Sequence, residues 1–138
     1  MPAWLDQLTI AASDLERSAA FYDAALEPLG IGRLAEFGDE EEGGAPVDAV
    51  AWGVPGESGQ PVLWIVAVSG GATATSGAHL RLRAAHPDEV RAFHRAGLAA
   101  GGTSTALPRR WAIFRSGEFG AAIADPAGNV IEVVSAES

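Results

Sequence analysis

The second half of this chain repeats the first, and the repeat limits the folds that it can adopt. The gap-free matches pair Leu8 with Leu80, Phe21 with Phe93, Leu26 with Leu98 and Gly30 with Gly102. After a short deletion, residues 62–66 also align with residues 130–134. Both halves read as a strand and a helix followed by further strands. We therefore predict one domain over residues 1–138, with modules at about 1–68 and 78–135 and a linker at 69–77.

Local signals predict where the elements of each module lie. In the first half, Ser13 or Asp14 caps a helix that Pro28 and Gly30 end. Strands are expected at 5–11, 31–37, 47–54 and 61–68, and a charged loop at 39–46. A hairpin closes the chain over 117–134 and turns at Asp125-Pro126-Ala127-Gly128-Asn129. This mixture predicts the α+β class, with two βαβββ modules related by a pseudo-twofold axis.

Alternation along the strands separates an apolar face from a polar one. The apolar side chains expected to pack beneath the helices are Leu8, Ile10, Leu80, Leu82, Ile131 and Val133. The opposite faces carry Gln7, Thr9, His79, Arg81 and Glu132. The pattern fits either a solvated sheet face or the lining of a cavity.

Composition removes several classes of function. The chain has 9 basic and 18 acidic residues and a net charge of −9, which argues against nucleic acid as a partner. It contains no cysteine, and every basic residue is arginine, so thiolate and lysine chemistry are excluded. No apolar run approaches the ~20 residues of a membrane span, and the first residues do not resemble a signal peptide. We expect a cytoplasmic protein that contacts no membrane.

Three segments together resemble the vicinal oxygen chelate superfamily, which includes glyoxalase I, extradiol dioxygenases and bleomycin-resistance proteins. They are LDQLTIAASDLERSAAFYDAALEPLG, GAHLRLRA and GAAIADPAGNVIEVV. The resemblance covers most of the chain, and the D-P-x-G-N-x-I-E ending is its most specific part. It implies paired βαβββ modules that form a cup-shaped mixed sheet, with the helices outside and a divalent metal inside.

The resemblance also implies a metal site. Gln7, His79 and Glu132 fall on ligand positions of the family, whereas Trp64 occupies the fourth position, which is a carboxylate in glyoxalase I. Imidazole and carboxylate suit zinc, nickel, manganese or iron, and Glu132 could also act as a catalytic base. The amide of Gln7 is a weaker donor than imidazole. The expected cofactor is thus a divalent metal held by at most three protein ligands.

Other polar and aromatic residues point to a substrate site. Arg81 shares a strand face with His79, and it either pairs with Glu132 or anchors an anionic ligand. Trp64, Trp111, Phe114 and Phe119 are candidates for stacking on a planar ligand, and Trp52 is interpreted as a core residue. His86 is expected near a helix cap and His94 on an exposed helix surface.

These observations favour an enzyme of the glyoxalase or dioxygenase type that acts on a small molecule. Such an enzyme would be a lyase, an isomerase or a dioxygenase, and its metal would stabilise an oxyanion. The alternative is a metal-free protein that binds or sequesters an anionic or aromatic compound. A structural dimer with a vestigial cup is a third reading. The family resemblance implies a homodimer, and the sequence does not decide whether modules pair within or between chains.

Overall fold

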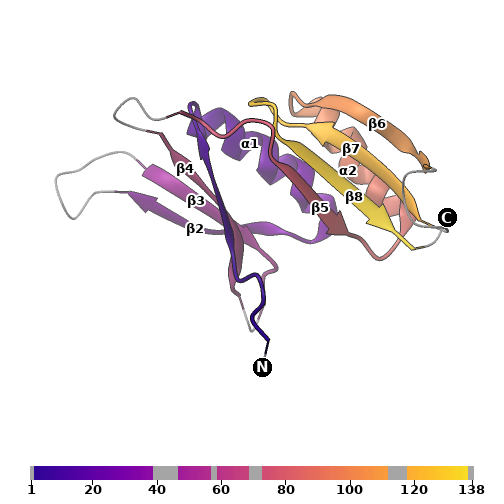
Figure 1. Cartoon of the computed structure of the whole chain (residues 1–138), viewed down its shortest axis with the longest axis horizontal. Coiled ribbons are helices and arrows are strands. Elements are labelled where there is room, and N and C mark those ends of the chain that lie inside the picture. Colours follow the sequence, from indigo (N-terminus) through magenta and orange to yellow (C-terminus); the bar gives the residue numbers. More distant parts are fainter. Residues whose placement is uncertain (1, 39–46, 57–58, 69–72, 112–117, 137–138) are drawn as a thin grey trace.

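Two modules of the same design make up the fold (Figure 1). The computed structural model describes residues 2–38, 47–56, 59–68, 73–111 and 118–136. The first module contains β1 (Leu8–Ala12), α1 (Leu15–Leu26), the short 3-10 helix η1 (Glu27–Leu29), β2 (Gly32–Gly38), β3 (Val47–Gly53) and β4 (Pro61–Ala67). The second contains β5 (His79–Arg83), α2 (Pro87–Ala99), β6 (Thr103–Arg110), β7 (Phe119–Ala124) and β8 (Val130–Ser135).

Each module folds its strands into one four-stranded mixed sheet. The strand orders are β1-β4-β3-β2 and β5-β8-β7-β6, so the two sheets have equivalent topology. In each sheet the first and last strands of the module pair in parallel, and the other neighbours are antiparallel. The predicted α+β class and the paired βαβββ modules are confirmed. The predicted loop at 39–46 lies outside the described residues.

The residues that cap the helices are those that the sequence predicts. The Asp14 side chain accepts a hydrogen bond from the backbone N–H of Arg17 (3.0 Å), and Gly30 ends η1 in the left-handed conformation, with φ of 76°. Before α2, Glu89 Oε1 accepts a hydrogen bond from the backbone N–H of His86 (2.9 Å). His86 is therefore the capping-region residue that the sequence predicted.

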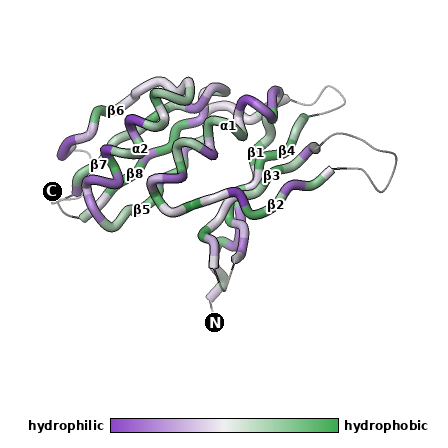
Figure 2. The backbone as a smooth tube through the Cα atoms, turned by 180° about the vertical axis from the view of Figure 1, so that it is seen from behind, coloured by the Kyte–Doolittle hydropathy of each residue, from purple (hydrophilic) through white to green (hydrophobic). Residues whose placement is uncertain are grey.

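The two modules meet through their helix-covered faces. Helices α1 and α2 contact each other, and α1 lies at the junction of the sheets when the chain is seen from either side (Figures 1 and 2). One core cluster contains Phe21 and Tyr22 of the first module together with Phe93 and Ile123 of the second. A Cβ atom at Gly102 would lie 2.6 Å from the Phe21 ring, so glycine permits this close approach. Within one chain, the opposite sheet faces are therefore directed away from the junction.

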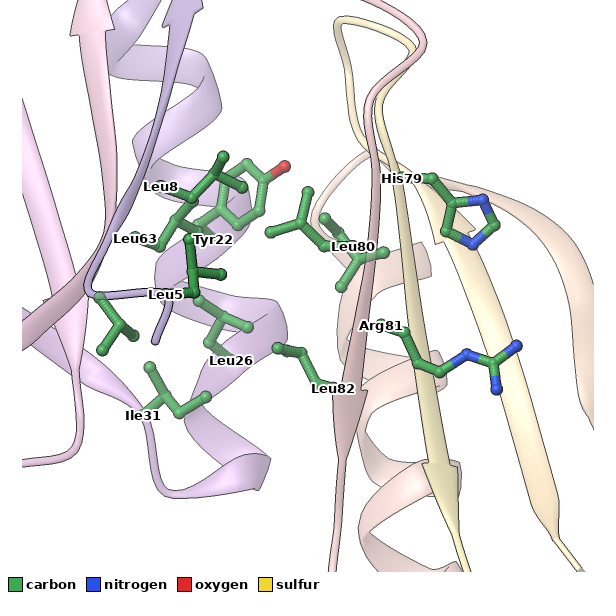
Figure 3. Close-up of a pocket in the computed structure, with 12 residues that line it drawn as sticks. Leu5, Leu8, Tyr22, Leu26, Ile31, Leu63, His79, Leu80, Arg81 and Leu82 are labelled. Atoms are coloured by element: carbon green, nitrogen blue, oxygen red, sulfur yellow. The ribbon is translucent and has the colours of Figure 1, made fainter. Parts of the chain in front are cut away.

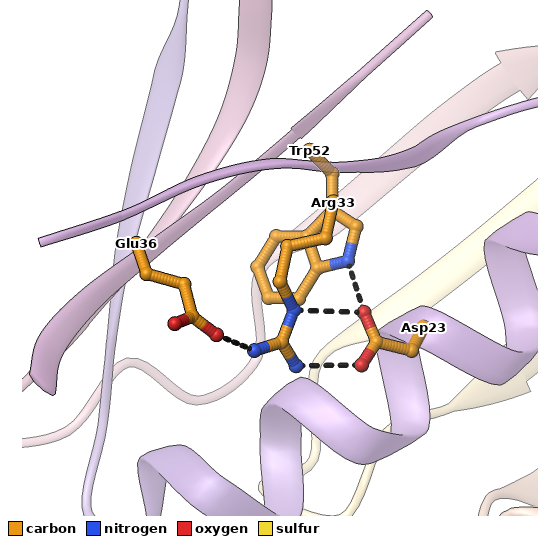
Figure 4. A network of polar contacts seen from close by, with 4 residues as sticks. All are labelled: Asp23, Arg33, Glu36 and Trp52. Atoms are coloured by element: carbon orange, nitrogen blue, oxygen red, sulfur yellow. Dashed lines mark hydrogen bonds and ion pairs between the residues drawn. The ribbon is translucent and has the colours of Figure 1, made fainter. Parts of the chain in front are cut away.

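A charged network ties α1 to the first sheet (Figure 4). Asp23 on α1 accepts hydrogen bonds from Arg33 Nη2 (2.5 Å), Arg33 Nε (3.2 Å) and the buried Trp52 Nε1 (2.9 Å). Arg33 also pairs with Glu36. The indole of Trp52 is fully buried, and the interpretation of this residue as core is confirmed. The network connects α1 to β2 and β3 and so stabilises the first module.

The structure corrects the expectation that His94 is exposed. Its side chain follows Val90 by one helical turn and joins the buried stripe of α2, where it is only 6% exposed. Its Nε2 atom lies 2.8 Å from Ser104 Oγ on β6. Burial lowers the pKa of His94, because desolvation disfavours the protonated ring.

This pKa shift predicts a dependence of stability on pH. The folded pKa lies below the unfolded value of about 6.5, so the stabilisation is complete above about pH 6.5 and is lost as the pH falls towards the folded pKa. His94→Gln keeps a polar group beside Ser104 but does not titrate. We expect urea denaturation to show a smaller loss of stability from about pH 7.5 to 5.5 in this variant than in the wild type. Equal losses in both proteins would contradict the assignment.

None of the helices in the described ranges is long and apolar enough to cross a lipid bilayer.

Candidate charged and aromatic binding faces

The polar face of the second sheet gathers the candidate residues of β5 and β8. Strand alternation places His79, Arg81 and Arg83 on one face of β5, with Leu80 and Leu82 on the other. Figure 3 shows His79 and Arg81 pointing away from the leucines. The parallel register sets Arg81 opposite Glu132. The pairing of β5 with β8 therefore brings together residues that are about fifty positions apart in the sequence.

Three close charge pairs and one imidazole–carboxylate contact connect these side chains. Arg81 Nε lies 2.5 Å from Glu132 Oε1, and His79 Nε2 lies 3.7 Å from Glu132 Oε2. Glu118, which directly precedes β7, joins the group: its carboxylate lies 2.6 Å from Arg83 Nη2 and 4.0 Å from Arg81 Nη1. Arg81 thus pairs with Glu132, one of the two alternatives that the sequence left open.

Burial divides this charged cluster into two layers. The carboxylate side chains of Glu118 and Glu132 are 6% and 9% exposed, whereas those of Arg81, Arg83 and His79 are 45%, 53% and 60% exposed. The acidic groups form a floor, and the two guanidinium groups and the imidazole form a rim that reaches solvent. A molecule that approaches this face meets guanidinium and imidazole before it meets a carboxylate.

The donor set does not fit a divalent metal well. A metal ion would need the carboxylate of Glu132 and a neutral imidazole as ligands. The guanidinium of Arg81 already contacts this carboxylate. Trp64, at the fourth position, offers an N–H donor and no lone pair. Within the described ranges, no group of three or more His, Cys, Asp or Glu residues could hold a metal ion. Gln7 is exposed and precedes β1. Ligation by Gln7, His79 and Glu132 stays a prediction.

The polar face of the first sheet carries an aromatic pair. Trp64 stacks on Phe37 of β2 with ring centroids 5.3 Å apart and planes at 23°. Phe37 is 52% exposed and Val62, on the same face of β4 as Trp64, is 49% exposed. The buried indole N–H of Trp64 has no hydrogen-bond acceptor in the described part of the chain. This face offers an exposed apolar surface with a buried indole N–H beneath it.

Of the other aromatic candidates, the structure places Phe119 away from these two faces. Phe119 is a 6% exposed core residue beneath the guanidinium of Arg91, and the β7–β8 register places it on the face opposite Glu132. The pleat turns it towards α2, and its contact with a substrate stays a prediction. Trp111 Nε1 donates to the Leu107 carbonyl (2.8 Å) beneath Arg109. Phe114 lies outside the described residues.

Sequence reasoning missed two members of the charged cluster. Arg83 has the same two-residue spacing from Arg81 that Arg81 has from His79, so alternation alone could have placed it on this face. Glu118 gave no comparable signal. It lies just outside a strand, and only the tertiary structure brings it to Arg81 and Arg83.

Comparisons with known proteins agree with the fold of paired βαβββ modules. The family model described as a glyoxalase-like domain matches residues 7–134. A crystal structure of a glyoxalase/bleomycin resistance protein from Albidiferax ferrireducens T118 is 31% identical, with a TM-score of 0.71, and the match covers 94% of this chain and 96% of that one. Lactoylglutathione lyase from Agrobacterium tumefaciens is 19% identical over 97% and 94% of the chains, with a TM-score of 0.63, which supports the fold alone. No curated protein gives a significant match.

Proposed function

This chain belongs to the glyoxalase-like domain family, and we propose that it binds a small organic anion with a planar group, without a resident metal. The observation that carries this proposal is the layered charged cluster of the second sheet. Buried Glu118 and Glu132 hold the partly exposed guanidinium groups of Arg81 and Arg83. Preorganised arginines bind carboxylates well, because their N–H groups lose little freedom on binding.

The aromatic face of the first sheet supplies the second half of the proposed site. Trp64, stacked on Phe37, would hold the planar part of the ligand. Leu63 and Leu80 line the junction between the modules, so their neighbours Trp64 and Arg81 are directed to opposite sides of the chain. We therefore propose a homodimer in which Trp64 and Gln7 of one copy face His79, Arg81 and Glu132 of the other.

Benzoate, a planar carboxylate, tests the binding proposal. We expect isothermal titration calorimetry to show saturable binding that weakens about tenfold or more in Arg81→Met/Glu132→Gln, since a charge-assisted hydrogen bond contributes ~1.5–3 kcal/mol. The paired change avoids leaving Glu132 as an unpaired buried charge. Arg17→Met, which removes an exposed arginine from α1, is the matched control and should bind as the wild type does.

The second candidate function is metal-dependent lyase, isomerase or dioxygenase chemistry with Glu132 as the base. Treatment with a chelator distinguishes it from metal-free binding. The 3.7 Å separation of His79 Nε2 and Glu132 Oε2 favours this candidate. Metal-free binding predicts the same benzoate affinity before and after treatment with EDTA. Binding that disappears with EDTA and returns with zinc, nickel, manganese or iron, in the wild type but not in His79→Ala, would reject our proposal in favour of the metal site.

A further inference from the structure

An apolar cleft of about 330 Å³ lies on the other side of β5, between the two modules (Figure 3). Its walls come from β1 and β4 of the first sheet, from α1, and from β5 and β8 of the second sheet. Nine of the twelve residues that line it are aliphatic, among them Leu5, Val62, Leu63, Leu80 and Leu82. The cleft is thus lined by elements of both modules.

The polar groups near the cleft are already engaged or turned away. Tyr22 lines the cleft with its ring, but its hydroxyl donates to Asp125 Oδ2 at 2.6 Å. His79 and Arg81 border it as well, yet the imidazole and the guanidinium point to the opposite side of β5 (Figure 3). A charged ligand in the cleft would lose hydration without gaining a partner. The lining therefore selects an uncharged, apolar molecule.

The size and exposure of the cleft suit a small ligand. Its volume lies near the lower end of the range for small-molecule pockets, ~300–1,000 Å³. Leu5 and Leu8, at its mouth, remain 74% and 36% exposed. Water in such a site finds few hydrogen-bond partners, so an apolar molecule gains by displacing it.

We propose that this intermodule cleft is a second binding site, for an uncharged hydrocarbon-like compound of about the size of a monocyclic aromatic or a short aliphatic chain. It is separate from the charged face that binds the anion in the proposed function, since the two sites use opposite faces of β5. Occupation would fill the junction between the modules and stabilise their relative placement.

Toluene and benzoate form a matched pair of probes, because they share a ring and differ in charge. In methyl NMR spectra of the wild-type protein, toluene should shift the Leu and Ile methyl signals of the cleft saturably and show nuclear Overhauser contacts to them. Benzoate should leave these signals unchanged. Leu82→Trp, which fills the cleft, should weaken toluene binding at least tenfold, whereas Leu107→Trp on the exposed surface of β6 should not.

Several results would overturn the proposal. These are the absence of saturable cleft shifts in the wild type, equal occupation of the cleft by benzoate, or unchanged toluene affinity in a folded Leu82→Trp protein. A second copy of the chain that covers the cleft would appear as a change of mass in light scattering on Leu82→Trp substitution, without toluene contacts, and would also reject it. The wild-type contacts decide the matter even if Leu82→Trp does not fold. Trp64→Ala changes the proposed anion site at a residue that does not line the cleft, and this variant should still bind toluene, so failure here is distinguishable from failure of anion binding.

Discussion

Asp125→Ala is expected to lower the free energy of unfolding by ~3–5 kcal/mol, a large part of the ~5–15 kcal/mol typical of a domain. The Asp125 side chain is buried in the turn between β7 and β8 and is 6% exposed. It accepts hydrogen bonds from the Tyr22 hydroxyl (2.6 Å) and from the backbone N–H groups of Ala127 (2.8 Å) and Asn129 (2.9 Å). Alanine would leave these donors buried without an acceptor.

The effect should be large because this turn connects three parts of the chain. Tyr22 lies on α1 of the first module, so its bond to Asp125 joins the modules directly. Burial and the Asp125 carboxylate both raise the pKa of Tyr22, which keeps the hydroxyl protonated as a donor. Asn129 accepts from the backbone of Ala78 (3.0 Å) and donates to the Thr75 carbonyl (3.1 Å), which fixes the segment that leads into β5.

Chemical denaturation followed by circular dichroism measures the loss. Tyr22→Phe removes only one hydrogen bond and keeps the ring, so we expect a smaller loss of ~1–2 kcal/mol. Asp48→Ala removes an exposed carboxylate from β3 and should change stability by no more than ~0.5 kcal/mol. A loss below ~1 kcal/mol in Asp125→Ala would show that the turn does not hold the modules together.

The elements were predictable because their signals are local. The cap at Asp14, the glycine at Gly30 and the turn at 125–129 each fix the backbone within a few residues. Alternation also assigned the faces of β5 and β8 correctly, since it depends only on the pleat. Ile131 and Val133 are buried as predicted.

What the sequence could not show depends on contacts between elements. Alternation turned Leu8 towards the helices, but it could not reveal that the modules leave a cleft there with Leu8 36% exposed. The pairing of Arg81 with Glu132 depends on the β5–β8 register, and the placement of Phe119 depends on the β7–β8 register. The prediction for His94 was wrong because the buried face of α2 is wider than the positions of its apolar residues suggest. This face also includes the polar side chain of His94.

Subunit mixing is expected to restore benzoate binding between two variants that each bind poorly. Trp64→Ala removes the proposed stacking surface, and Arg81→Met/Glu132→Gln removes the proposed anion anchor. If each site takes Trp64 from one copy and Arg81 from the other, both homodimers should bind about tenfold or more weakly. In a randomly mixed population half of the dimers are heterodimers, and each of these has one intact site. About a quarter of all sites should then recover wild-type affinity.

The measurement requires exchange of subunits, which co-expression with two different purification tags provides. Calorimetry on the doubly purified heterodimer should show one tight benzoate site per dimer. Each variant taken through the same procedure with itself is the control and should show none. A site built within a single chain predicts no recovery, because neither chain of the heterodimer has both halves. Normal binding by the Trp64→Ala homodimer would instead remove the aromatic face from the site. Recovery therefore requires both the dimer and the opposed faces, since Trp64 and Arg81 are directed to opposite sides of one chain.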